Sequence, residues 1–299
     1  MDMVPDTLRH RSTVWHPENI TQNKTGEYMG KTLYLECYSG ISGDMTVAAL
    51  LDLGVSREVL EKALRSLPVG GFRTEISRVK KSGLDVCDFN VIPEHDNHDH
   101  DMEYLHGHEH THDMEHHHHE HSHEHSYPHE HRGMKEITEI IQGSAMTDRA
   151  KKMALQVFEV LAHAESKAHG VPVEKVHFHE VGAIDSIVDI AAIAVCMDNL
   201  DISEVIVPVL YEGTGFIRCQ HGQIPVPVPA VAHIAEDHHL KLKITDIQGE
   251  LVTPTGAAVV AAFRTDEKLP EDFSLVKTGL GAGKREYRCP GILRAMLIQ

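Results

Sequence analysis

The sequence predicts an α+β fold in which strands and helices are mixed in one or two lobes, with an α/β arrangement as the alternative. Short strand-like runs alternate with helical runs along the chain, which favours a mixed class over either pure class. Apolar residues make up 41% of the 299 residues, enough for a substantial core. A His-rich stretch with almost no aliphatic side chains interrupts this pattern and is expected to be a disordered insertion.

Composition divides the chain into four parts. Residues 1–30 show no regular pattern and are expected to form a disordered extension. Residues 31–92 are expected to form an N-terminal αβ lobe, and residues 133–299 the main αβ lobe. Residues 93–132 form the His-rich linker between them.

The N-terminal lobe is expected to open with a strand, because aliphatic and aromatic side chains crowd together at residues 31–38 before a Gly/Ser loop. Apolar residues at helical spacing then predict two helices, the second beginning at Ser56. Alternating residues on either side of Lys81-Ser-Gly83 predict a β-hairpin. The expected bounds are 45–54 and 56–68 for the helices, and 72–80 and 84–92 for the hairpin strands.

The main lobe is expected to contain several helices. Thr147 should cap a long helix that runs to His169, because Gly170 and Pro172 follow it. An apolar helix is expected from about 184 to 200, and a Pro-rich lead should open another within residues 225–239. A further helix should begin after the sequence Thr-Pro-Thr-Gly at 253–256, among short strands.

Charge and cysteine content exclude several classes of function. The formal charge is −17, but eleven acidic residues lie in residues 94–131, so the rest of the chain carries only −6. That remainder has no basic stripe, and we expect no nucleic-acid partner. Five widely spaced cysteines without a C-x-x-C pair indicate neither a disulfide framework nor a structural zinc site. With no secretory or membrane-spanning apolar run, the chain is expected to be cytoplasmic, with no membrane partner.

The His-rich linker is expected to bind metal ions. It holds sixteen of the 26 histidines, interleaved with carboxylates, and imidazole suits Ni, Zn, Cu and Co. Catalysis within it is not expected, because a flexible segment lacks the preorganisation that a transition state needs. The candidate ligands in its densest part are His116, His117, His118, His119, His121, His123 and His125.

A second group of candidate ligands lies in the sequence HFHE and the helix after it. On an extended strand His177 and His179 would face the same side and could share one ion, while Phe178 would face the core. Glu180 follows them, and Asp185 and Asp189 would share one face of the next helix. The alternative is a helix cap with a solvated acidic face, and the residues alone leave both open.

Three segments could bind an anion. The loop with Ser42, Gly43 and Asp44 lies between a strand and a helix, where backbone N–H groups can cradle a phosphate. Thr253 and Thr255 precede another helix in the same way. The glycine-rich run at 279–283 leads to two cations, which could pair with an anion in a flexible loop. These cations are Lys284 and Arg285. The alternatives are an ordinary helix cap and a solvated turn.

Five motifs, in order, resemble the nickel-insertion protein family of nickel-pincer cofactor biosynthesis, LarC. They are KTLYLECYSGISGDM, VHFHEVGAIDSIVDI, HGQIPVPVPA, GELVTPTGAA and GLGAGKRE, and the resemblance runs from about Lys31 to Gln299. The family is understood to insert Ni²⁺ into pyridinium-3,5-bisthiocarboxylic acid mononucleotide, forming two Ni–S bonds and one Ni–C bond with consumption of CTP. The resemblance implies a nickel insertase, a metal chelatase of the lyase class, whose product serves apo lactate racemase and related enzymes.

The resemblance also implies roles for residues and partners. It favours His177, His179, Glu180 and Asp185 as the site of metal transfer or proton abstraction. Glu36 and Tyr38 depart mildly from the family pattern, where Asp and Phe are expected. Complete members carry a further C-terminal domain, so CTP with Mn²⁺ or Mg²⁺ is expected only with that domain, which could be supplied by a separate C-terminal chain. The alternative function is a nickel-binding metallochaperone or storage protein whose partner chain performs the insertion.

Overall fold

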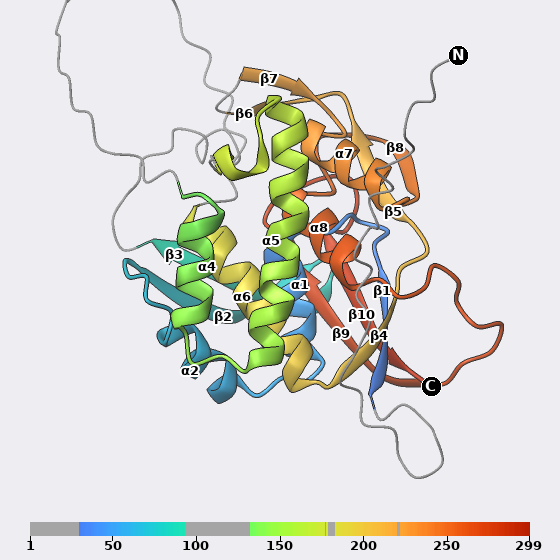
Figure 1. Ribbon diagram of the computed structural model, residues 1–299. Coiled ribbons are helices and arrows are strands. Elements are labelled where there is room, and N and C mark those ends of the chain that lie inside the picture. The colour runs from blue at the N-terminus through green and yellow to red at the C-terminus, as the bar shows by residue number, and fades with distance from the viewer. Residues whose placement is uncertain (1–29, 94–131, 177, 179–182, 220–221) are drawn as a thin grey trace, which may run out of the picture.

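The protein is described by a computed structural model that covers residues 30–93, 132–176, 178, 183–219 and 222–299 (Figure 1). Within these residues it has seven α-helices, one short 3₁₀ helix and ten strands. The strands are β1 (Lys31–Glu36), β2 (Phe72–Lys81), β3 (Leu84–Pro93), β4 (Ile202–Ile206), β5 (Leu210–Thr214), β6 (Phe216–Cys219), β7 (Gly222–Pro225), β8 (Leu242–Gln248), β9 (Leu275–Ala282) and β10 (Ile292–Ile298). The helices are α1 (Gly43–Asp52), α2 (Arg57–Arg65), α4 (Met134–Gly143), α5 (Asp148–His169), η1 (Val173–Lys175), α6 (Ile184–Asn199), α7 (Pro229–Asp237) and α8 (Pro254–Phe263).

The main sheet joins strands from both ends of the sequence. Its six strands lie in the order β2-β3-β9-β10-β1-β4, with β1 antiparallel to β10 and parallel to β4. Strand β3 meets β9 in parallel where Cys87 pairs with Gly281. Two smaller pairs, β5-β8 and β6-β7, lie at one end of the molecule near α7 (Figure 1). Strands of both directions mixed with helices confirm the α+β class.

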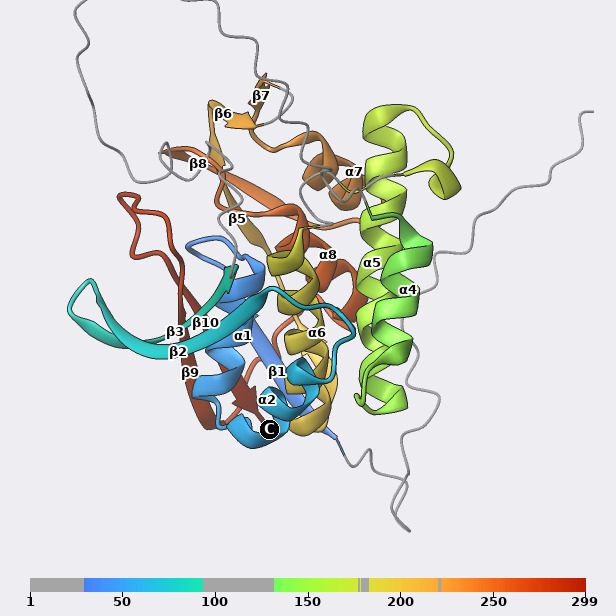
Figure 2. The same cartoon turned by 90° about the vertical axis from the view of Figure 1, so that its left-hand side faces the viewer.

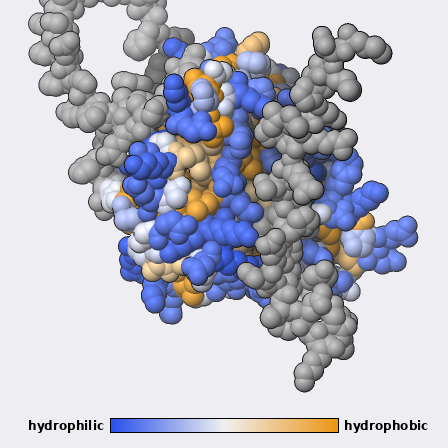
Figure 3. Space-filling view, in the orientation of Figure 1, coloured by the Kyte–Doolittle hydropathy of each residue, from blue (hydrophilic) through white to orange (hydrophobic). Residues whose placement is uncertain are grey.

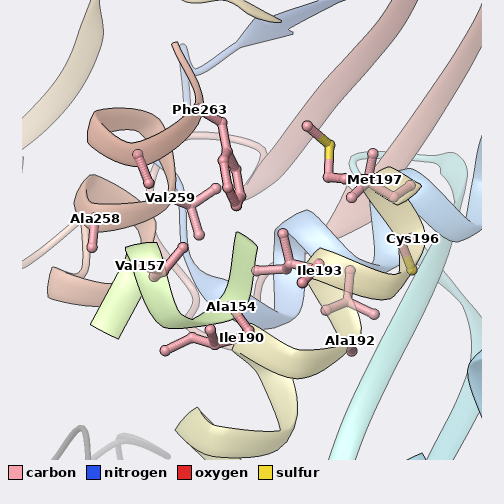
Figure 4. Packing of buried hydrophobic residues seen from close by; sticks show 14 of the residues in the cluster. Ala154, Val157, Ile190, Ala192, Ile193, Cys196, Met197, Ala258, Val259 and Phe263 are labelled. Carbon is pink, nitrogen blue, oxygen red and sulfur yellow. The ribbon is translucent and has the colours of Figure 1, made fainter. Parts of the chain in front are cut away.

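The helices form layers on one face of the main sheet, as the rotated view shows (Figure 2). Helix α1 packs on β9, β3 and β10, and α6 packs on α1. Helix α5 packs on α6 and α8, farther from the sheet. Buried alanine, valine and isoleucine side chains of α5, α6 and α8 interlock there (Figure 4). Residues before and after the His-rich linker therefore share one hydrophobic core.

Several local predictions are confirmed by the structure. The side chain of Ser56 accepts a hydrogen bond from the N–H of Val59 at the start of α2, and Thr147 caps α5 in the same way through Ala150. Gly170 ends α5 in the left-handed conformation, with φ +64°. The hairpin of β2 and β3 pairs Lys81 with Leu84 across its turn. These features depend on neighbouring residues, so the sequence alone could predict them.

The predicted loop at residues 279–283 is wrong, because most of it is the end of strand β9. Gly279 and Gly281 lie under α1, and a Cβ atom on Gly281 would be 2.0 Å from the carbonyl oxygen of Met45. The two glycines therefore let the backbone of a strand contact the backbone of a helix.

Hydrophilic side chains cover most of the described surface on the face that Figure 3 shows, with smaller groups of hydrophobic residues between them. A helix both long enough and apolar enough to cross a bilayer does not occur among the described residues.

Adding one methyl group at Gly281 should disrupt the contact between α1 and β9. We expect Gly281→Ala to lower the free energy of unfolding by about 1–3 kcal/mol, since the new Cβ would overlap the backbone of Met45. Urea denaturation followed by circular dichroism measures this loss. Gly70→Ala is the matched control, because no atom lies within 4 Å of a Cβ at that position. Equal stability of the two variants would contradict the proposed packing role of Gly281.

Candidate functional site

The segment between β1 and α1 lies against the first turn of α8. The N–H of Ile41 donates to the carbonyl oxygen of Leu251 at 2.9 Å, and the N–H of Thr253 donates to the carbonyl oxygen of Ile41 at 3.0 Å. A Cβ atom on Gly256 would be 2.3 Å from that same oxygen of Ile41. Glycine at this position therefore allows α8 to approach the segment, and the hydrogen bonds fix the relative position of the two.

Helix α6 also contacts the first turn of α1, through Asp189. A Cβ atom on Gly43 would be 2.5 Å from Oδ2 of Asp189, which lies in the second turn of α6. The missing side chain at Gly43 is what allows the carboxyl group of Asp189 to reach α1. The next residue of α1 is Asp44, so two carboxyl groups from different helices face the same region.

The carboxyl groups of Asp44 and Asp189 differ in their hydrogen bonds. The hydroxyl of Ser42 donates to Oδ1 of Asp44. Oδ1 of Asp189 is fully enclosed although the residue keeps some exposure, and within the described chain it has no hydrogen-bond partner. Burial raises the pKa of both groups, and repulsion from Asp44 and Asp185 raises the pKa of Asp189 further. The structure thus holds a poorly compensated pair of acids at the start of α1.

The two predicted cations are already paired with carboxylates of the protein. Lys284 forms an ion pair with Asp88 on β3. Its ammonium also opposes the rise in the pKa of Asp44 and of Asp189 without cancelling it. Arg285 pairs with Glu250 at 2.7 Å. The segment after β9 therefore supplies positive charge to the site, but this charge is largely matched by the chain's own acids.

Glu212 on β5 is a functional candidate that the sequence analysis missed. Its side chain is completely buried, and Oε1 accepts hydrogen bonds from the N–H groups of Gly213 (2.7 Å), Leu251 (2.8 Å) and Val252 (3.2 Å). Oε2 is enclosed and has no partner within the described residues. Burial raises the pKa of this carboxyl to about 7, although the three N–H groups oppose the shift. The hydrogen bonds from Leu251 and Val252 to Glu212 hold the segment that precedes α8.

Some predicted site residues lie outside the described residues. These are His177, His179, Glu180 and the candidate ligands His116, His117, His118, His119, His121, His123 and His125. Within the described residues, no group of three or more His, Cys, Asp and Glu side chains is placed to hold a metal ion.

The described neighbours of the HFHE sequence agree with part of its prediction. Phe178 is buried, as expected, and its ring contacts that of Phe158 edge-on with centroids 6.3 Å apart. Its N–H donates to the carbonyl oxygen of Arg132 at 3.1 Å. Asp185 is exposed in the first turn of α6, whereas Asp189, one turn later, reaches α1.

Ser42, Gly43 and Asp44 lie at the start of α1 and Thr253 and Thr255 at the start of α8, whereas Lys284 and Arg285 follow strand β9. Ser42 precedes α1 without a side-chain cap, and Thr253 caps α8 by accepting from the N–H of Gly256 at 3.1 Å. Thr255 is buried. Two carboxyl groups at the start of α1 oppose a phosphate there, because like charges repel. Anion binding by Ser42, Gly43, Asp44, Thr253, Thr255, Lys284 and Arg285 stays a prediction.

Glu212 should make the stability of the protein depend on pH. Its folded-state pKa of about 7 lies above the ordinary value of 4.5, so its contribution to stability is greatest below pH 4.5 and is lost as the pH rises through 7. Between pH 5 and pH 8 we expect a loss on the order of 3 kcal/mol that Glu212→Gln abolishes. Denaturant titrations across this range measure it. Glu271→Gln, at an exposed site, should retain the loss; an unchanged pH profile in Glu212→Gln would contradict this assignment.

Comparison with known proteins identifies the family. A family model described as nickel insertion protein matches residues 33–299. The pyridinium-3,5-bisthiocarboxylic acid mononucleotide nickel insertion protein of Alkaliphilus metalliredigens is 52% identical over 272 residues, which cover 91% of this chain and 61% of the relative. The protein of that name from Clostridium acetobutylicum is 41% identical, covering 89% of this chain and 64% of the relative. A putative nickel insertion protein of Geobacter sp. strain M21 is 39% identical, with 89% and 61% covered.

No solved structure matches the chain. The chain spans less than two thirds of the length of these curated relatives. The family model nevertheless covers the sequence from within β1 to the last residue. The chain therefore belongs to the nickel insertion protein family.

Proposed function

We propose that this chain takes part in inserting nickel into pyridinium-3,5-bisthiocarboxylic acid mononucleotide, the precursor of the nickel-pincer cofactor. The observation that carries the proposal is the 52% identity, across most of this chain, to a relative named for that reaction. Nickel is a substrate in this proposal, and the enzyme would belong to the lyase class as a metal chelatase. The cytoplasmic location expected from the sequence stays a prediction.

The proposed chemistry requires a base. Two thiocarboxylates of the precursor bind Ni²⁺ as soft ligands, and the third bond forms when the ring carbon exchanges its proton for the metal. The proton must pass to an acceptor near the ring. We propose His177, His179, Glu180 and Asp185 for metal transfer and proton abstraction. Asp185 lies on the same helix as Asp189, so these acids and the start of α1 belong to one region.

The His-rich linker is proposed to collect nickel for the folded part of the chain. Its many imidazoles can bind several ions in varied geometries, which suits capture better than catalysis. The second candidate function is a nickel metallochaperone or storage protein, with insertion performed by a partner chain. The composition of residues 94–131 favours that alternative as well, so an experiment must separate the two.

CTP is proposed to bind outside this chain. The carboxyl groups of Asp44 and Asp189 would repel a nucleotide phosphate at the start of α1, and Lys284 and Arg285 already pair with Asp88 and Glu250, which favours a CTP site outside the described residues. We therefore propose that CTP with Mn²⁺ or Mg²⁺ binds to the part of the family's longer members that this sequence does not match. Apo lactate racemase or a related enzyme would receive the product.

Replacing His177 and His179 with alanine should abolish formation of the nickel-pincer product even when nickel is abundant. The assay combines the chain with precursor, Ni²⁺, CTP and Mn²⁺, with and without the remaining part of a longer relative, and detects product by mass spectrometry. The matched control is His233→Ala with His239→Ala, two histidines on and after α7. Full turnover by the His177/His179 variant would refute their assigned role.

Deleting residues 94–131 should leave product formation intact at high nickel and reduce it at limiting nickel. The folded part would still perform the insertion, while the reservoir would be lost. Product yield measured across a nickel titration gives the result. Loss of all nickel-dependent function at every concentration would instead support the metallochaperone.

A further inference from the structure

We infer that Asp44 and Asp189 hold a divalent cation between the start of α1 and the second turn of α6. The inference deepens the proposed function and relies on it only for the expectation that nickel is the cation in the cell. The ligand chemistry is that of carboxylate oxygens, with Ser42 supplying a hydroxyl beside Asp44.

The backbone arrangement brings the two acids to one place. Gly43 lies so close to Asp189 that a Cβ atom would overlap its carboxyl group, at 2.5 Å from Oδ2 and 3.1 Å from Cγ. Any side chain at position 43 would fill the space that this carboxyl group occupies. Asp44 is the next residue of α1 after Gly43, and its charge raises the pKa of Asp189.

Among the described residues, Oδ1 of Asp189 lacks the hydrogen bonds that normally compensate a buried carboxylate oxygen. Its Oδ1 is enclosed, and within the described part of the chain no N–H or O–H group donates to it. Glu212 provides the contrast, because one of its oxygens accepts three backbone N–H groups. An enclosed and unpartnered carboxylate oxygen is costly, and a bound cation would remove that cost.

The local charge matches a divalent ion. Among the described residues, the ammonium of Lys284 pairs with Asp88, and its charge also acts on the carboxyl groups of Asp44 and Asp189. When all are ionised, two negative charges remain uncompensated, and Asp185 adds to the negative potential. One proton would neutralise only half of this excess, whereas a divalent cation would neutralise all of it.

Mn²⁺ is the probe that tests this site in the full chain. Carboxylates suit Mn²⁺, whereas imidazole prefers later transition metals, so the His-rich linker interferes least with this ion. Free Mn²⁺ is followed by electron paramagnetic resonance during titration. We expect Asp189→Asn and Asp44→Asn each to weaken the binding of one Mn²⁺ at least tenfold. The matched control, Asp272→Asn at an exposed site, should bind as the wild type does.

Further measurements keep the result decisive. Lys284→Met should strengthen Mn²⁺ binding several-fold, because an opposing positive charge is removed; circular dichroism verifies that each variant is folded. If Asp189→Asn does not fold, Asp44→Asn and Lys284→Met carry the test. Unchanged Mn²⁺ binding in the folded variants overturns the inference. It is also overturned if the wild type binds no Mn²⁺ and only its stability depends on pH, because that result is expected when Asp44 and Asp189 share a proton instead of a cation.

Competition with Ni²⁺ separates this site from the proposed function. Displacement of the bound Mn²⁺ by Ni²⁺, beyond the nickel that the linker takes up, supports nickel as the cation. Displacement by Mg²⁺ alone overturns the assignment to nickel. Because binding is measured without precursor or CTP, an inactive insertase with an intact Mn²⁺ site would refute the proposed function and leave this site standing.

Discussion

Close approach of a neighbouring segment to the backbone of a glycine is the constraint on which the rest of this structure depends. Gly281 allows α1 to lie on β9, Gly43 allows Asp189 to reach α1, and Gly256 allows α8 to approach Ile41. At each position a single methyl group would overlap a neighbouring atom. Since α1 takes part in two of these contacts, its position is fixed from the sheet side and from the helical side, and the acids at its start are fixed with it.

The site illustrates two ways of burying a carboxyl group. Glu212 shares one oxygen among three N–H groups and thereby binds the segment before α8 to β5. Asp189 has no such donors among the described residues and lies near other acids instead. The first arrangement rigidifies a segment, whereas the second stores electrostatic strain that a ligand can relieve. Glu212 contacts the segment before α8 and Asp189 contacts the start of α1, so the two carboxyl groups act on different elements.

Sequence reasoning succeeded where the cause was local. The caps at Ser56 and Thr147 and the turn between β2 and β3 follow from residues a few positions apart, and each was confirmed. It failed at Gly279 and Gly281, because a glycine that permits close packing looks the same in sequence as one in a loop. The four-residue spacing of Asp185 and Asp189 predicted a shared helix face, but only tertiary packing decides that Asp189 meets Gly43. The role of Glu212 was harder to predict from the sequence, since two of its hydrogen-bond partners, Leu251 and Val252, lie about forty residues away.

The bridge between Arg132 and Phe178 has a consequence for how captured metal could travel. Arg132 immediately follows His131, the last histidine of the His-rich linker, while Phe178 stands between His177 and His179 in the sequence. Arg132 is joined to His131 by a peptide bond, so this bridge connects the described residue that follows the linker with the sequence HFHE. Under the proposed function, an ion released from the end of the linker would meet the folded part at a high effective concentration, and its delivery would be intramolecular rather than a diffusional search.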